Sequence, residues 1–190
     1  FNKWLSVICD QVYCDTPVYI NEMVNKHKPS SAISTARVNF LAHLLDNAAE
    51  QNLGFEDGKF PPEKTIYLTL LQNTGIHKRI GREYLMDTPT EESFLPLWNT
   101  CEAFLDSTKE KPRKLGELIK ILRSRPFKLK QGVIDLWLPA FLIIKKNDYS
   151  LYNDAGIYIH TITREVLDIM QKSPAGFSVK AFNVEGVKLD

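Results

Sequence analysis

The feature that most constrains the fold is a nearly continuous apolar run at residues 133–144, which reads VIDLWLPAFLII. Only Asp135 interrupts it. A helix that is apolar around its whole circumference must be covered on every side, and this run is far shorter than the ~20 residues that cross a bilayer. We therefore predict a buried helix over Gln131–Lys145.

The segments around this helix predict a small module at residues 109–190. A helix is expected before it at Leu115–Arg123, where apolar residues recur at helical spacing. After it, Asn153–Gly156 is a turn signal between two short strands. Two helices, a hairpin, a third helix and a last strand are the order typical of a winged-helix-type domain. The later elements are predicted at Tyr149–Tyr152, Ile157–Thr161, Arg164–Gln171 and Phe177–Phe182.

Residues 1–108 predict a separate helical domain. Most of their apolar residues recur at intervals of three and four, whereas residues 76–89 read as irregular or partly helical. The charged stretch Ser107–Arg113 is the best candidate boundary. The fold class is thus mainly α with a small β component, in two domains. The predicted helices of the first domain are 2–13, 18–26, 31–52, one opened by Pro61-Pro62, and one from about Pro96 to Asp106.

Charge is unevenly distributed along the chain, although the net charge is only +1. Residues 1–108 hold 9 basic and 14 acidic groups, whereas residues 109–146 hold 11 basic and 3 acidic groups. Dense Lys and Arg attract phosphate. We expect nucleic-acid backbone contact at Lys114, Lys120, Arg123, Arg125, Lys128 and Lys130, while a solvated surface or a dock for the acidic first 108 residues is the alternative for the same block.

Base-specific reading of DNA is not expected. In a helix-turn-helix, the second helix presents polar side chains to base edges. Here that helix would be Gly132–Lys145, whose apolar body has almost nothing to donate. Contact would therefore involve the backbone, through the preceding helix, the Arg125–Lys130 loop or the wing near Tyr149–Tyr158.

Motifs of known chemistry are missing from the sequence. The loop Gly54–Lys59 is one residue short of a phosphate loop, and Phe60 stands where Ser or Thr must hold magnesium. His77, beside Lys78 and Arg79, reads as part of an exposed basic loop. No catalytic residue, cofactor or metal is therefore assigned. The alternative is an enzyme, above all a metal-dependent nuclease assembled from distant residues. Asp57, Glu63 and Lys64 are the residue types of such a centre, but they lie in a loop and on a Pro-opened helix rather than on adjacent strands that converge on a metal.

The three cysteines point to a reducing compartment, because an odd count argues against a disulfide framework. Cys9 and Cys14 with His27 form only a loose zinc pattern. Cys9 lies on the apolar stripe of its predicted helix, and Cys101 lies on that of another, so both are expected to be buried. We predict a cytoplasmic protein without a membrane partner.

The order of segments resembles accessory parts of large bacterial phage-defence ATPases of the BREX type. The similarity is carried by RPFKLKQGVIDLWLPAFLI and YSLYNDAGIYI, followed by a helix and SPAGFSVKAF, and upstream by NEMVNKHKPSSAISTAR, FPPEKTIYLTLLQNTGIH and LPLWNTCEAFL. These motifs are structural and carry no catalytic residues. The resemblance implies a non-catalytic segment whose ATP site lies elsewhere in a longer parent chain. Its expected partners are the rest of that chain, other protein subunits and the DNA backbone.

Overall fold

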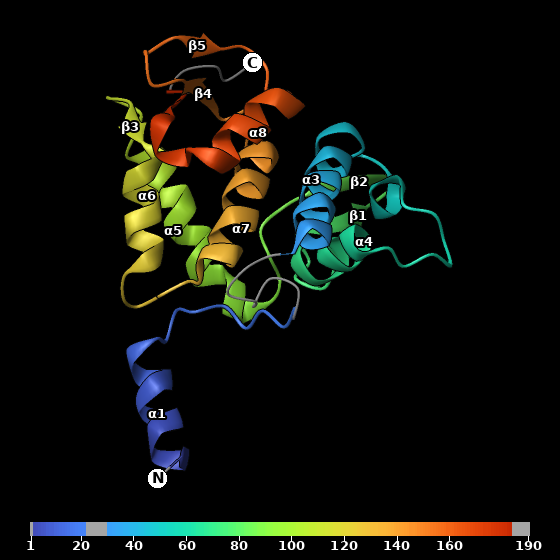
Figure 1. Ribbon diagram of the computed structural model, residues 1–190, viewed down its shortest axis with the longest axis vertical. Coiled ribbons are helices and arrows are strands. Elements are labelled where there is room, and N and C mark those ends of the chain that lie inside the picture. Colours follow the sequence, from blue (N-terminus) through green and yellow to red (C-terminus); the bar gives the residue numbers. More distant parts are fainter. Residues whose placement is uncertain (1, 22–29, 184–190) are drawn as a thin grey trace.

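The computed structural model describes residues 2–21 and 30–183, and it is mainly helical with a small antiparallel β component, as predicted (Figure 1). The helices are α1 (Asn2–Val12), α3 (Ser31–Asp46), α4 (Pro62–Tyr67) continued by a π-helical turn (Leu68–Gln72), α5 (Leu95–Asp106), α6 (Leu115–Arg123), α7 (Gln131–Ile144) and α8 (Arg164–Lys172), with 3-10 turns at Gln51–Gly54, Glu92–Phe94 and Pro174–Gly176. The strands are β1 (His77–Ile80), β2 (Glu83–Met86), β3 (Arg113–Lys114), β4 (Tyr149–Tyr152), β5 (Tyr158–Ile159) and β6 (Ser178–Ala181).

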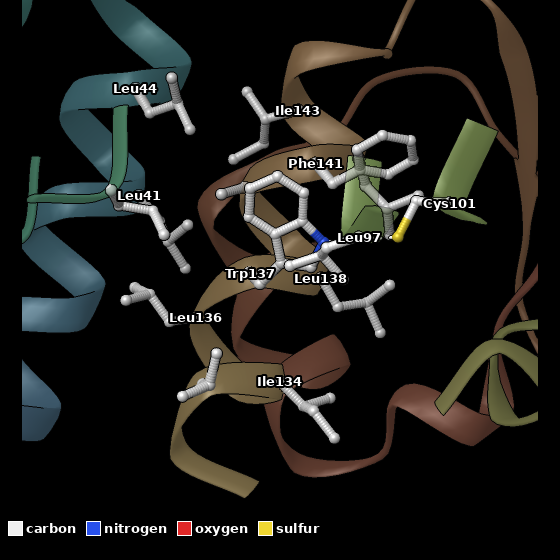
Figure 2. Packing of buried hydrophobic residues seen from close by; sticks show 14 of the residues in the cluster. Leu41, Leu44, Leu97, Cys101, Ile134, Leu136, Trp137, Leu138, Phe141 and Ile143 are labelled. Atoms are coloured by element: carbon white, nitrogen blue, oxygen red, sulfur yellow. Dashed lines mark hydrogen bonds between the residues drawn. The ribbon is translucent and has the colours of Figure 1, made fainter. Parts of the chain in front are cut away.

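Helix α7 lies at the centre of the molecule (Figure 1), and its burial confirms the prediction from its apolar sequence. It lies between α3 on one side and α5 and α6 on the other (Figure 1). Figure 2 shows Leu136 and Ile143 on the side of Leu41 and Leu44 of α3. All ten residues from Val133 to Ile143 other than Asp135 are buried. Covering the whole circumference of α7 thus requires elements from both halves of the chain.

Aromatic rings fill the side of α7 that faces α5. The Trp137 ring lies 6.3 Å from that of Trp98 and 6.1 Å from that of Phe94, both in edge-on arrangements. Its indole N–H donates to Sγ of Cys101 at 3.4 Å. Cys101 is fully buried, and burial raises the pKa of its thiol to about 12. These contacts join α7 to the helix that precedes the predicted domain boundary.

The four-stranded sheet has the order β3-β6-β4-β5, and every pair is antiparallel. Two hydrogen bonds fix it to the helices. The buried Thr108 hydroxyl accepts from the backbone N–H of Ala181 at 2.8 Å, and the Tyr149 hydroxyl donates to the carbonyl of Leu142 at 2.8 Å. The hairpin, the Thr163-capped helix and the closing strand are found where the sequence predicts them.

Residues 76–89 form a β-hairpin rather than the irregular or partly helical segment that was predicted. His77 pairs with Met86 and Ile80 with Glu83, so a two-residue turn joins β1 and β2. Gly81 in that turn has φ +65°, a conformation that glycine adopts without steric cost. Both strands are only four residues long and carry charged side chains, so apolar periodicity does not reveal this hairpin.

Two helix predictions were too long. The helix expected at 31–52 ends at Asp46, because the chain then turns through Asn52 and Leu53, both with positive φ. The helix expected at 18–26 is wrong for residues 18–21, which form neither helix nor strand, while its remainder lies outside the described residues. Val18, Tyr19 and Asn21 instead contact the surface of the body through Ser93, Phe94 and Thr69.

Helix α1 stands apart from the body (Figure 1), so the prediction that Cys9 is buried is wrong. The helix forms where its spacing predicts, but its apolar residues are exposed, and Trp4 is 77% exposed. A periodic stripe shows that a face is apolar without showing that anything covers it. Among the helices of residues 2–21 and 30–183, none is long and apolar enough to cross a membrane.

The division into domains at 108 and 109 stays a prediction. The buried core is one cluster that runs through residues of both segments. Contacts between α3 and α7 and between α5 and β6 cross the proposed boundary. An ion pair between Arg37 and Asp135, at 3.4 Å, crosses it as well.

Truncating Trp137 tests the central role of α7. We expect Trp137→Ala to lower the free energy of unfolding by about 3–5 kcal/mol, since it empties a large buried volume. The matched control, Trp4→Ala, should change the free energy by less than about 0.5 kcal/mol because that ring is exposed. Urea denaturation followed by circular dichroism measures both, and equal effects of the two variants would contradict the central packing of α7.

The thiols provide a second test. Cys9 and Cys14 are exposed and Cys101 is buried, so a chromogenic disulfide reagent should titrate two thiols quickly in the native protein. The third should react only after denaturation. Rapid titration of three thiols without denaturant would show that the core around Cys101 opens readily.

Candidate nucleic-acid interface

Five of the six predicted contact residues lie around the connection between α6 and α7. Its course is set by backbone hydrogen bonds, from Lys128 N–H to the carbonyl of Ser124 at 2.8 Å and from Leu129 N–H to that of Leu122 at 2.9 Å. Phe127 and Leu129 point into the core and are buried. The intervening charged side chains therefore point outward. We call these five residues the basic loop patch: Lys120, Arg123, Arg125, Lys128 and Lys130.

All five residues of the basic loop patch are exposed, and none forms an ion pair within 4 Å with a described residue. Arg123 instead donates to the side-chain oxygen of Gln131. No acidic residue occurs between 120 and 130. Several cations elsewhere pair with carboxylates, as Lys78–Asp87, Arg113–Glu117 and Arg164–Asp46 illustrate.

The sixth predicted residue, Lys114, is not part of this patch. It lies on β3 at the opposite end of α6, about 13 Å along the helix axis from Arg123. Its ammonium group pairs with Asp154 at 3.3 Å. The sequence already places Lys114 before the first residue of the predicted helix Leu115–Arg123, but the density of basic residues alone does not take the length of that helix into account.

The ends of two helices meet at the basic loop patch. Lys120 and Arg123 lie in the last turn of α6, where cations are favoured by the helix dipole. Lys130 precedes the first turn of α7, whose positive end favours anions. The body of α7 is buried and offers no polar groups to base edges. The patch can thus attract phosphate groups without reading a base sequence.

The N-terminal segment contacts the same loop, which sequence reasoning missed. The Thr16 hydroxyl lies within hydrogen-bonding distance of the carbonyls of Phe127 and Pro126, the latter at 3.4 Å. Pro17 beside it is buried. No local pattern marks this contact, because it joins residues more than 100 positions apart. It places α1 next to the basic loop patch (Figure 1).

The residue types considered for a nuclease centre are engaged in separate contacts. Asn52 donates to Asp57 at 3.4 Å, Asn39 donates to Glu63 at 3.3 Å, and the buried Lys64 donates to the carbonyl of Glu56 at 2.6 Å. Within residues 2–21 and 30–183, no group of three His, Cys, Asp or Glu residues is placed to hold a metal ion. Of the loose zinc pattern, Cys9 and Cys14 are exposed, and His27 lies outside the described residues.

A surface hollow of about 420 Å³ lies beside the sheet, and its charges are largely compensated. Lys145 at its wall pairs with Glu102 at 2.5 Å and lies 5.0 Å from the ring centre of Trp98. Asp148 is 3.7 Å from the same ammonium group. Lys109 pairs with Asp106. These pairings hold the rim of the hollow together.

His77 is buried, so the prediction that it belongs to an exposed basic loop is wrong. It is 3% exposed, and its Nδ1 lies 2.9 Å from the Tyr67 hydroxyl. Nε2 has no hydrogen-bond partner of ordinary geometry in the described part of the chain. Desolvation lowers the pKa of His77, and the nearby backbone of Ala48 partly offsets this. Exposure rises along strand β1, from the buried His77 through the half-buried Lys78 to the exposed Arg79 and Ile80, so His77 lies at the end of the strand that meets the core.

The buried imidazole should make stability depend on pH. In the unfolded chain it binds a proton near pH 6.5, whereas in the folded protein its pKa is lower. The free energy of unfolding should therefore fall as the pH drops below about 6.5, because the unfolded state then binds more protons.

His77→Gln should remove this part of the pH dependence, which urea midpoints measured between about pH 7.5 and 5 would show. His160→Gln, at an exposed histidine, is the matched control and should keep the wild-type slope. The same slope in His77→Gln and in the wild type would contradict the assignment.

Comparison of the chain with known protein families, curated protein sequences and solved structures gives no match in any of the three. We therefore infer the function from the chemistry and placement of this chain's own residues.

Proposed function

We propose that this chain is a non-catalytic segment of a larger bacterial ATPase system, in which it contacts partner proteins and binds the nucleic-acid backbone through the basic loop patch. The observation that carries the proposal is the gathering of five exposed cations around one helix connection, none of them paired with a carboxylate of the described residues. Such a cluster favours phosphate, since each neutralised phosphate releases counterions. Binding through it is independent of base sequence.

The fold supports a wing-type arrangement within this proposal. Helices α6 and α7 precede the β4–β5 hairpin, and α8 and β6 complete the unit. In this arrangement α7 serves as core rather than as a recognition helix, because its residues are buried. The basic loop patch and the hairpin are then the parts of the unit that remain for contact with nucleic acid or protein.

The sequence resemblance suits the same role. The similar segments of phage-defence ATPases of the BREX type lie outside the ATPase module, and this chain has no phosphate loop of its own. We propose a cytoplasmic assembly, with the rest of a parent chain or other subunits as partners. The exposed apolar face of α1, which includes Trp4 and Ile8, is a surface that a protein partner would cover.

Reversing charges in the basic loop patch tests the proposal. The wild-type protein should retard duplex DNA of arbitrary sequence at low salt, and the affinity should fall steeply with salt. Five phosphate contacts correspond to a slope no steeper than about −4.5 when the logarithm of the binding constant is plotted against the logarithm of the salt concentration. The triple variant Lys120→Glu, Arg123→Glu, Lys128→Glu should lose binding at every salt concentration.

A matched control reverses three exposed lysines elsewhere, Lys111, Lys146 and Lys172, and changes the net charge by the same amount. It should keep most of the wild-type affinity. Equal loss in both triple variants would show that only net charge matters, and a wild-type protein that does not bind at low salt would disprove nucleic-acid binding. Metal-dependent cleavage of DNA by the wild type would instead favour the nuclease alternative.

A further inference from the structure

We propose that the outer face of the four-stranded sheet binds an unpaired nucleic-acid strand by base stacking. This inference goes beyond the proposed function and does not rest on it, because the face and the basic loop patch lie at opposite ends of α6. The outer sheet face is formed by Lys114, Ser150, Tyr152, Tyr158, Ser178 and Lys180.

The strand register aligns the key residues in one row across all four strands. Lys114 is opposite Ser178, Ser178 is opposite Tyr152, and Tyr152 is opposite Tyr158. Lys180, opposite Ser150, belongs to the next outward row. At about 4.8 Å between strands, the row is about 14 Å long, which is long enough for several unstacked nucleotides.

The row faces solvent, because the adjacent row faces the core. Val179 and Leu151, each one residue away from a member of the outer row, are 0% and 2% exposed. Side chains alternate between the faces of a sheet. Tyr158 is 42% exposed, and Tyr152 is half-buried among its neighbours.

The chemistry of this face fits a single strand better than a duplex or an apolar partner. The rings of Tyr152 and Tyr158 lie with centroids 5.8 Å apart, and His160 continues the aromatic cluster 4.5 Å from Tyr158. Aromatic rings on neighbouring strands are platforms on which unpaired bases stack. The hydroxyls of Ser150 and Ser178 lie between them and the cations and can donate to phosphate or sugar oxygens.

Two lysines supply charge that is complementary to the strand. Lys180 forms no ion pair within 4 Å with a described residue. Lys114 pairs with Asp154, but both side chains are mostly exposed, at 63% and 74%. Such a surface pair is weak, so a phosphate can compete with Asp154 for the ammonium group. This also gives a role to the one predicted contact residue that the basic loop patch does not include.

The test uses a fluorescein-labelled oligothymidylate of about ten nucleotides, with binding followed by fluorescence anisotropy. Tyr158→Ala should weaken binding about tenfold, the effect of losing one stacking ring. Tyr158→Phe should bind as the wild type does, because it keeps the ring. Phe60→Ala, which removes an exposed aromatic ring far from the sheet, is the control and should also bind normally.

Cross-linking provides a measurement that needs no variant. Oligonucleotides carrying bromodeoxyuridine should cross-link to Tyr152 or Tyr158 on irradiation, as mass spectrometry of the tryptic peptides would show. The triple charge reversal of the basic loop patch should lose duplex binding and keep oligothymidylate binding. Unchanged affinity in Tyr158→Ala, cross-links confined to other surfaces, or loss of oligothymidylate binding in the triple variant would each overturn the proposal.

Discussion

Burial of α7 on every side is the constraint on which the rest of the structure depends. No single neighbour can cover a helix that is apolar around its whole circumference, so α3, α5, α6 and α8 all contact it or its immediate surroundings. Figure 2 shows side chains from both halves of the chain meeting there. The continuous core is a direct consequence, and it makes the positions of all other elements depend on one another.

The same constraint shapes the candidate interface. Because α6 and α7 are both packed against the core, the short connection between them must turn at the surface, where Phe127 and Leu129 anchor it from within. The charged side chains of this connection therefore point outward into solvent. Packing thereby produces a cluster of cations that pair with no carboxylate in the part of the chain that the structure describes, although each residue alone is an ordinary surface lysine or arginine.

The inner face of the four-stranded sheet packs against the core, whereas its outer face is exposed to solvent. Thr108 and Tyr149 tie the inner side to α5 and α7, and Val179 and Leu151 fill it. The outer side is left to residues that tolerate water on one surface, namely tyrosines, serines and lysines. In our two proposals, the basic loop patch would bind the duplex backbone through charge, and the outer sheet face would bind an unpaired strand through stacking. Helix α6 separates these two surfaces.

The sequence alone determined the elements whose pattern is local. Apolar periodicity located α5, α6, α7 and α8, and the turn signal at Asn153–Gly156 located the β4–β5 hairpin, because these patterns report the geometry of a few consecutive turns. The density of lysine and arginine likewise indicated where exposed cations gather. Local patterns failed where a segment is short and charged, as in the β1–β2 hairpin.

Only the tertiary structure decided what each face meets. It left Cys9 exposed and buried His77, paired Lys114 with Asp154, and joined Thr16 to Phe127 across more than a hundred positions. It also aligned Lys114, Ser178, Tyr152 and Tyr158 in one row, although they come from four separate strands. The physical reason is that burial and strand register depend on which distant elements pack together. The spacing of residues within one element carries no information about those partners.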